Sequence, residues 1–133
     1  MIDVGVDPKI KLAALWASVM FCYIYADYFG LFMPGALAKM NQGQIPPLGQ
    51  ATDAVMVGVS LMLALPSVMI FLSVALPARP NRILNLIMGA AYTAIIAVTM
   101  AGGPAFIIFY GVIEMALTLL VVYYAWTWPR AQE

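Results

Sequence analysis

The sequence has no histidine, one cysteine, and only six basic and six acidic residues in a chain of 133. Without histidine, haem ligation by imidazole, the usual zinc sites and histidine acid–base catalysis are excluded. The single thiol, Cys22, cannot form an internal disulfide or a C-x-x-C redox pair. The balanced charge leaves no basic patch for nucleic acid. We therefore predict no metal, no cofactor and no nucleic-acid partner.

What the chain has in excess is apolar residues, which make up 65% of it, against 9% that are charged. Soluble domains contain about 45–50% apolar and about 25% charged residues. Runs of about 20 apolar residues are long enough to cross a bilayer as helices. The sequence predicts an all-α, polytopic membrane protein, a four-transmembrane-helix bundle in one domain over residues 1–133. The expected spans are 11–33, 53–76, 83–101 and 104–128, with a long connection at 34–52.

Proline, glycine and capping residues predict where these helices begin and end. Asp7-Pro8 is a helix start, and Thr52 or Asp53 is an N-cap for the second span. Gly102-Gly103-Pro104 predicts a tight hairpin between the last two spans. The remaining connections are one or two turns of interfacial helix at 34–40, an irregular stretch around Pro46-Pro47, and a stiff, basic segment at 77–82.

Pro66 lies near the centre of the second span and predicts a kink. Proline donates no backbone hydrogen bond, so the carbonyl four residues earlier, that of Met62, loses its partner. Ser60 and Ser67 are near enough to help satisfy the freed backbone groups.

Basic residues predict the orientation, because cytoplasmic loops carry an excess of Lys and Arg. Only Lys39 falls on the opposite side of the four-span model. The N and C termini are therefore expected in the cytoplasm, with the chain in a bacterial cytoplasmic (inner) membrane. The residues on the predicted cytoplasmic side are Lys9, Lys11, Arg79, Arg82 and Arg130.

Each span carries a stripe of small or polar residues at steps of three and four, which places them on one helix face. Such stripes form the seams between membrane helices. The expected stripes are Trp16, Met20, Tyr23, Asp27 and Gly30; Asp53, Val57, Ser60, Ala64, Ser67 and Phe71; Asn85, Gly89, Tyr92, Ile96, Thr99 and Gly103; and Ile107, Tyr110, Glu114, Leu117 or Thr118, Val121, Tyr124 and Trp128.

Two carboxyl groups, Asp27 and Glu114, lie inside predicted spans. Ionisable residues there are costly and mark functional sites. Each follows a tyrosine by four residues, Tyr23 or Tyr110, so a hydrogen bond within the helix is expected. Such a bond would be structural, whereas a free acid could carry protons. Both alternatives stay open for both acids.

Helix rise places Glu114 about 15 Å from Pro104, near the bilayer midplane, and Asp27 in the outer third. The two acids are then about 10 Å apart in depth, which is far for one reacting centre. Pro66 and Ser67 fall at the level of Glu114. If the second and fourth spans are neighbours, these residues form a midplane pocket.

The first span runs from Lys11-Leu12 through Leu15-Trp16 to the segment Tyr-Ile-Tyr-Ala-Asp-Tyr-Phe-Gly-Leu-Phe-Met-Pro-Gly-Ala-Leu at residues 23–37. The last span combines Glu114 with a Tyr- and Trp-rich end at 123–129. Together they resemble a family of small bacterial four-helix membrane proteins of unknown function. The resemblance implies a shape like that of DoxX-type bundles. It implies no activity and no catalytic residue.

Three functions fit these residues. The first is binding of a lipophilic or cationic small molecule with proton-linked transport, in which Glu114 and Asp27 carry protons; four helices are few for a complete pathway, so a homo-oligomer is expected. The second is a metal-free membrane enzyme in which Glu114 is a general acid on a lipid-soluble substrate. The third is a structural or accessory subunit. The candidate ligand-binding residues are Tyr23, Asp27, Ser60, Ser67, Tyr92, Tyr110, Glu114 and Thr118.

Overall fold

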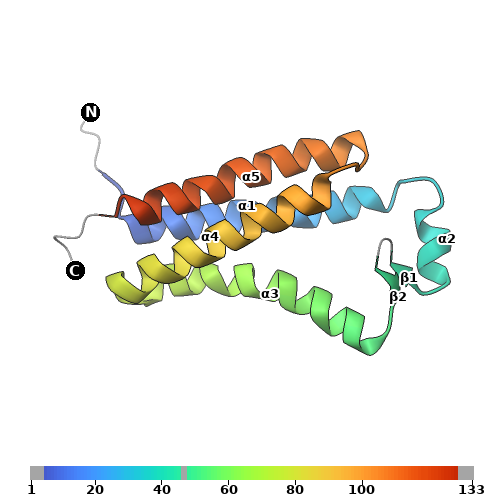
Figure 1. Cartoon of the computed structure of the whole chain (residues 1–133), viewed down its shortest axis with the longest axis horizontal. Coiled ribbons are helices and arrows are strands. Elements are labelled where there is room, and N and C mark those ends of the chain that lie inside the picture. The colour runs from blue at the N-terminus through green and yellow to red at the C-terminus, as the bar shows by residue number, and fades with distance from the viewer. Residues whose placement is uncertain (1–4, 46–47, 129–133) are drawn as a thin grey trace.

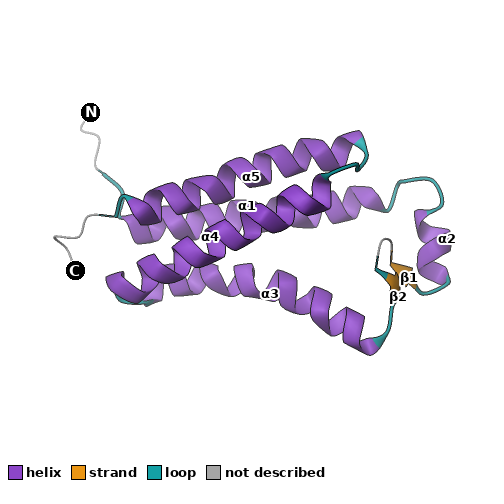
Figure 2. Cartoon of the chain, viewed as in Figure 1, coloured by secondary structure: helices purple, strands orange, loops and turns teal. Residues whose placement is uncertain are grey.

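Four long helices make up most of the chain (Figures 1 and 2). The computed structural model describes residues 5–45 and 48–128. The connection between the first two long helices holds a short helix and a two-stranded antiparallel hairpin. The elements are α1 (Pro8–Gly30), α2 (Ala36–Asn41), β1 (Gln44–Ile45), β2 (Gly49–Gln50), α3 (Asp53–Ala75), α4 (Ala78–Met100) and α5 (Ala105–Trp126).

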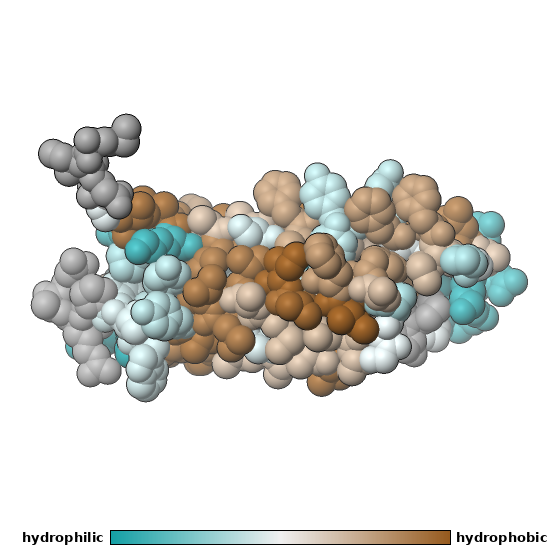
Figure 3. All heavy atoms as spheres, turned by 90° about the horizontal axis from the view of Figure 1, so that it is seen from above, coloured by the Kyte–Doolittle hydropathy of each residue, from teal (hydrophilic) through white to brown (hydrophobic). Residues whose placement is uncertain are grey.

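Helices α1, α3, α4 and α5 are each long and apolar enough to cross a membrane. Their outward surfaces carry large apolar side chains, such as Phe21, Phe71 and Phe109. On the face shown in Figure 3, apolar residues gather over the middle, and the most hydrophilic residues lie at the two ends. This distribution matches a bilayer with water on both sides. The predicted all-α, four-transmembrane-helix bundle is confirmed. The side of the membrane on which each end lies stays a prediction, and Arg130 lies outside the described residues.

The helix boundaries that were predicted from capping residues in the sequence agree with the structure. The Asp7 side chain accepts a hydrogen bond from the Lys9 amide at 2.8 Å. Thr52 accepts one from the Val55 amide at 3.2 Å. Gly102 has a φ of +73° in the hairpin between α4 and α5, a conformation that glycine adopts without strain. The irregular stretch around Pro46-Pro47 lies outside the described residues, but the β1–β2 pairing on either side of it was not predicted.

The prediction of a stiff connection at 77–82 is wrong. Helix α4 begins at Ala78, so Pro80 and Arg82 lie in its first turns. Proline is tolerated there because the first amides of a helix have no intrahelical partner. The Asn81 amide already bonds to the Pro77 carbonyl at 3.1 Å.

The helices pack unevenly. Helix α1 packs against both α3 and α5, and α4 packs along α5. Helices α3 and α4 meet near their short connection and separate toward the α2 end of the molecule, where they make few contacts (Figure 1). Because α3 and α5 are not close neighbours, the predicted midplane pocket of Pro66, Ser67 and Glu114 does not form.

A close seam joins α4 to α5 at Gly89. A Cβ atom added there would lie 2.9 Å from Val122 Cγ2 and 3.1 Å from Val121 Cγ1. The predicted inward stripe of α4 is confirmed at Asn85, Gly89, Tyr92 and Ile96, which are all buried. Because glycine has no side chain, the backbones of α4 and α5 can approach closely here, as helices do at small residues in other membrane bundles.

The predicted inward stripe of α3 is wrong. Its six residues are exposed, and the buried residues of α3 are Pro66, Met69 and Ser73. Ser67 donates its hydroxyl to the Leu63 carbonyl of its own helix at 2.8 Å. A serine paired in this way is satisfied while facing lipid, so its position does not reveal the inner face.

A buried polar cluster of Trp16, Ser73, Asn81 and Asn85 joins α1, α3 and α4 near the α3–α4 connection. Trp16 Nε1 donates to Asn85 Oδ1 at 2.8 Å, and Asn85 Nδ2 donates to Asn81 Oδ1 at 2.7 Å. Asn81 Nδ2 donates to the Ser73 carbonyl at 2.6 Å. Ser73 Oγ lies 3.4 Å from Asn85 Oδ1. Every member has a partner, which is the arrangement that buried polar groups require. We call this set the paired cluster.

Candidate functional site

The two membrane carboxyl groups line one cavity of about 380 Å³ between α1, α4 and α5. Asp27 and Tyr23 come from α1, Thr99 from the end of α4, and Glu114 from α5. We call this the acid cavity. Its other lining residues are Ala26, Ile96, Met100, Gly103, Pro104, Ile107 and Gly111.

Glu114 is the buried acid of this cavity. Its residue retains 5% of its accessible surface, and it makes no hydrogen bond or ion pair with any described residue. In the described chain, every side-chain oxygen or nitrogen of a buried residue either has a hydrogen-bond partner or borders open space. The Glu114 carboxyl oxygens therefore contact the cavity. A carboxyl group withdrawn from water and left unpaired is costly, so the cavity is where its partner would be found.

Asp27 is the open acid of this cavity. Its residue is exposed on α1, and it too makes no hydrogen bond or ion pair with a described residue. It borders both the acid cavity and a second cavity described below. Glu114 and Asp27 thus approach the same space from different helices, one from within and one from the surface.

The expected tyrosine–acid hydrogen bonds within α1 and α5 are wrong. Tyr23 lines the cavity without bonding to Asp27, and Tyr110 does not line it. Tyr110 instead packs edge-to-face with Phe109, with ring centroids 5.6 Å apart. Helical side chains lean toward the N-terminus. A tyrosine ring therefore carries its hydroxyl away from a carboxyl group four residues later.

The two acids line one cavity, and their expected separation of about 10 Å in depth stays a prediction. The α5 wall of the acid cavity extends from Ile107 to Glu114, two turns of helix. A cavity whose wall spans two turns of helix is lined by residues of different depth. Depth alone, estimated from helix rise, could not show this.

A second cavity of about 170 Å³ lies between α1, α3 and α4, where α3 separates from α4. It shares three lining residues with the acid cavity, Tyr23, Asp27 and Thr99. We call it the side cavity. Its other lining residues, Val59, Met62, Leu63, Tyr92 and Ile95, are mostly apolar.

Tyr92 lines the side cavity and also bonds across it to α3. Its hydroxyl donates to the Met62 carbonyl at 2.6 Å. This is the carbonyl expected to lose its partner to Pro66, and the structure satisfies it from α4 and not from Ser60 or Ser67. The bond ties α3 to α4.

The remaining predicted site residues lie elsewhere. Ser60 and Ser67 are exposed on α3 and line neither cavity. Thr118 is buried in the α4–α5 seam, where the Thr93 hydroxyl donates to it at 2.7 Å. Among the residues missed, Gly111 carried a usable signal. A Cβ atom there would lie 2.5 Å from Met100 Sδ, so glycine marks a close approach beside the cavity.

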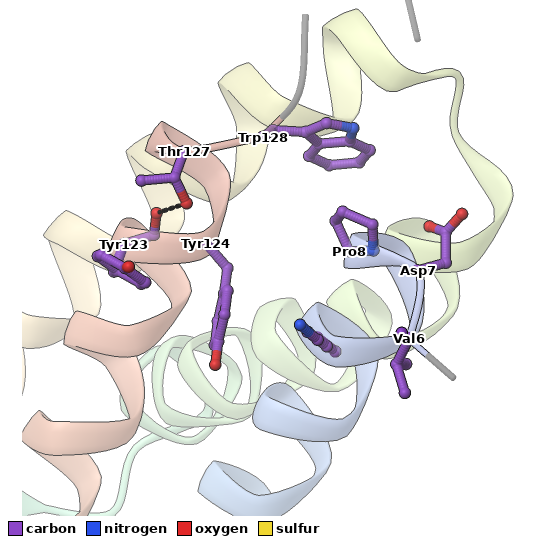
Figure 4. Close-up of a pocket in the computed structure, with 9 residues that line it drawn as sticks. Val6, Asp7, Pro8, Tyr123, Tyr124, Thr127 and Trp128 are labelled. Carbon is purple, nitrogen blue, oxygen red and sulfur yellow. Dashed lines mark hydrogen bonds between the residues drawn. The ribbon is translucent and has the colours of Figure 1, made fainter. Parts of the chain in front are cut away.

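A third cavity, about 550 Å³, lies at the opposite end of the bundle, between the start of α1 and the end of α5 (Figure 4). Lys11 Nζ lies 5.0 Å from the Tyr124 ring centroid, a cation–π distance. Thr127 donates its hydroxyl to the Tyr123 carbonyl at 2.8 Å, as the figure marks. Nearby, Arg82 donates to the Ala125 carbonyl at 2.9 Å and so caps α5. This end holds none of the predicted site residues.

Among the described residues, no three Asp, Glu or Cys side chains gather in a group that could hold a metal ion. The acid cavity supplies two carboxyl groups and the hydroxyls of Tyr23 and Thr99. Its chemistry is that of an acidic and aromatic site in apolar surroundings.

Comparison with known families identifies the family of this chain. The model of a family of unknown function, DUF6326, matches residues 4–133. The chain belongs to this family. The predicted kinship to an uncharacterised family is thereby confirmed, while the likeness in shape to DoxX-type bundles stays a prediction. No curated protein and no solved structure matches the chain. Membership of DUF6326 brings no activity, so function rests on the site.

Proposed function

We propose that this protein binds a lipophilic organic cation in the acid cavity, in a bacterial cytoplasmic membrane. One observation carries the proposal. Glu114 is buried and unpaired, and it faces a cavity that it shares with the equally unpaired Asp27. Intramembrane acids normally face one another, a basic group or a ligand path.

The charge of the cavity favours a cation from outside the chain. Neither the acid cavity nor the side cavity is lined by Lys or Arg. The protein therefore supplies negative charge without its own counter-charge. A cation bound between Asp27 and Glu114 would offset the cost of withdrawing both groups from water. The Tyr23 and Tyr92 rings offer further cation–π contacts.

An organic cation fits this cavity better than a metal ion. Calcium takes about six to eight oxygen ligands, and magnesium about six in strict octahedral geometry. In the acid cavity only four side chains carry oxygen, those of Tyr23, Asp27, Thr99 and Glu114, and most of the wall is apolar, including Ile96, Met100 and Ile107. Apolar walls with a few charged groups are typical of sites for small organic molecules.

Proton-linked transport would follow from the same pair of acids. A protonated carboxyl group of Glu114 that receives an ammonium ion releases its proton and becomes the carboxylate partner. Release of the cation then allows the proton to return. A second copy of the chain is expected to complete a pathway across the membrane, because four helices rarely form one alone.

The enzyme alternative also has an observation in its favour. The objection to it was the separation of the acids, yet Asp27 and Glu114 line one cavity. Glu114 would act as general acid on a lipid-soluble substrate, with Asp27 stabilising developing positive charge. Recovery of a chemically altered ligand after incubation would favour this function over binding and transport.

The test is binding of octylamine to the protein in nanodiscs. We expect saturable binding that weakens by about tenfold or more, equivalent to about 1.4 kcal/mol, in Glu114→Gln and in Asp27→Asn. The matched control is Asp53→Asn, which removes an exposed carboxyl group at the start of α3 outside both cavities. A dye in the buffer should report proton release from wild type. Equal binding by all four proteins would refute the proposal.

A further inference from the structure

Building on the proposed function, we infer that the ligand is an amphipathic amine. Its amino head lies between Asp27 and Glu114, and its apolar tail lies in the side cavity between α3 and α4. The inference concerns the shape of the ligand and its route of entry, which the charge of the acid cavity does not determine.

The junction between the two cavities is the first reason. Tyr23, Asp27 and Thr99 line both, so the two cavities are neighbours that share these side chains. Asp27 lines both cavities, whereas Glu114 lines the acid cavity alone. A head group held by both acids would therefore have its nearest apolar space next to Asp27.

The lining of the side cavity is the second reason. Its wall on α3 is Val59, Met62 and Leu63, and α4 contributes Ile95 and the ring of Tyr92. The hydrogen bond between the Tyr92 hydroxyl and the Met62 carbonyl satisfies both of these polar groups. No charged residue besides Asp27 lines this space. Such a wall suits an alkyl or aryl tail, and it has no group that could pair with a second charged group of the ligand.

The packing of α3 is the third reason, because it gives the tail a path from the bilayer. Helices α3 and α4 make few contacts where they diverge (Figure 1). Met62 lines the side cavity and is 38% exposed. An amphipathic amine already dissolved in the membrane could enter here sideways without its tail crossing water.

Photolabelling locates the tail directly. The probe is octylamine carrying a diazirine near the end of its chain, added to the protein in phosphatidylcholine nanodiscs. After illumination, peptide mass spectrometry identifies the labelled residues. We expect saturable labelling of Val59, Met62, Leu63 or Ile95, competed by unlabelled octylamine.

Two substitutions on α3 sharpen the result. Leu63→Trp places a larger side chain in the side cavity, and we expect labelling of that cavity to fall by about fivefold or more, the size of an overpacking penalty. Leu61→Trp is the matched control, because Leu61 is 56% exposed and lines neither cavity. Val59→Phe replaces Leu63→Trp if that variant fails to give a monodisperse, cooperatively unfolding protein.

The outcomes separate this inference from the proposed function. Labelling on α3 and Ile95 that disappears in Glu114→Gln and Asp27→Asn supports both. Saturable labelling that needs the two acids but falls on Met100 or Ile107 overturns the inference and leaves the cation site standing. Labelling of lipid-facing residues alone, unaffected by Glu114→Gln, overturns both.

Discussion

The paired cluster and the acid cavity are two polar regions in the same membrane bundle, and they are built in opposite ways. In the paired cluster, Trp16 and Asn85 are fully buried and joined at 2.8 Å. In the acid cavity, Glu114 is almost as buried but has no partner, and open space lies beside it. In the paired cluster, the polar groups bond to one another and hold the helices together. In the acid cavity, the carboxyl groups remain free to bind a ligand or a proton.

The comparison shows that burial alone does not distinguish a structural polar residue from a functional one. What differs is whether the protein itself completes the hydrogen bonds. Substitutions in the paired cluster should therefore act on stability. Substitutions in the acid cavity should act on binding and leave the fold in place.

The largest effect on stability is expected for Asn85→Leu. The change removes the acceptor of Trp16 Nε1 and the partner of Asn81. Each orphaned buried group costs about 1–3 kcal/mol, so the free energy of unfolding should fall by about 2–4 kcal/mol. Thermal unfolding in detergent measures it, with Ser18→Ala as control because that exposed hydroxyl bonds only its own helix. Equal stability of both variants would break the comparison.

Next in size is Gly89→Leu, which tests whether the α4–α5 seam is as close as described. Its first side-chain atom would lie 2.9 Å from Val122 Cγ2. Overpacking of this kind costs about 1–3 kcal/mol. Gly58→Leu is the matched control, since nothing lies within 4 Å of a Cβ atom there. A loss of equal size in both proteins would mean that glycine is needed for the helix itself and not for the seam.

A smaller effect is expected for Tyr92→Phe, which removes the hydrogen bond to the Met62 carbonyl while keeping the ring. Hydrogen bonds between membrane helices contribute about 0.6 kcal/mol on average and up to about 1.7. The free energy of unfolding should fall within that range, against no change in Tyr123→Phe, whose ring is exposed. Because Tyr92 also lines the side cavity, we further expect a change in octylamine binding. Unaltered stability and binding would show that the bond does not hold α3.

The smallest effect on stability is expected for Glu114→Gln, less than about 1 kcal/mol, because no partner is lost. The same variant should give the largest loss of octylamine binding. A fall in the free energy of unfolding as large as that of Asn85→Leu would place Glu114 in a structural network. That result would remove the distinction between the two regions.

The sequence predicted the features that depend on composition and local pattern. Helix number, the Asp7 and Thr52 caps and the inward face of α4 follow from apolar runs, capping side chains and a stripe around Gly89. The inner face of α3 was wrong because that helix is apolar on every side. Its serines can face lipid by bonding their own backbone, so the pattern of polar residues carries no information there.

The candidate site was predicted in its residues and not in its arrangement. Asp27, Glu114 and Tyr23 were identified because acids are rare in membrane spans. Their meeting in one cavity depends on which helices are neighbours, and the placement of α1 between α3 and α5 is a tertiary property. The partner of the Met62 carbonyl shows the same limit: Pro66 predicted the vacancy, but Tyr92 comes from a different helix 30 positions away.

The most direct test of the central claim is infrared spectroscopy of the Glu114 carboxyl group in nanodiscs, with Glu114→Gln to assign the band. An open, unpaired acid should exchange its proton promptly in D2O, titrate between about pH 4 and 9, and shift when octylamine is added. A Glu114 band that neither exchanges, nor titrates, nor responds to the amine would show a sealed structural group. The cation site and everything built on it would then be wrong.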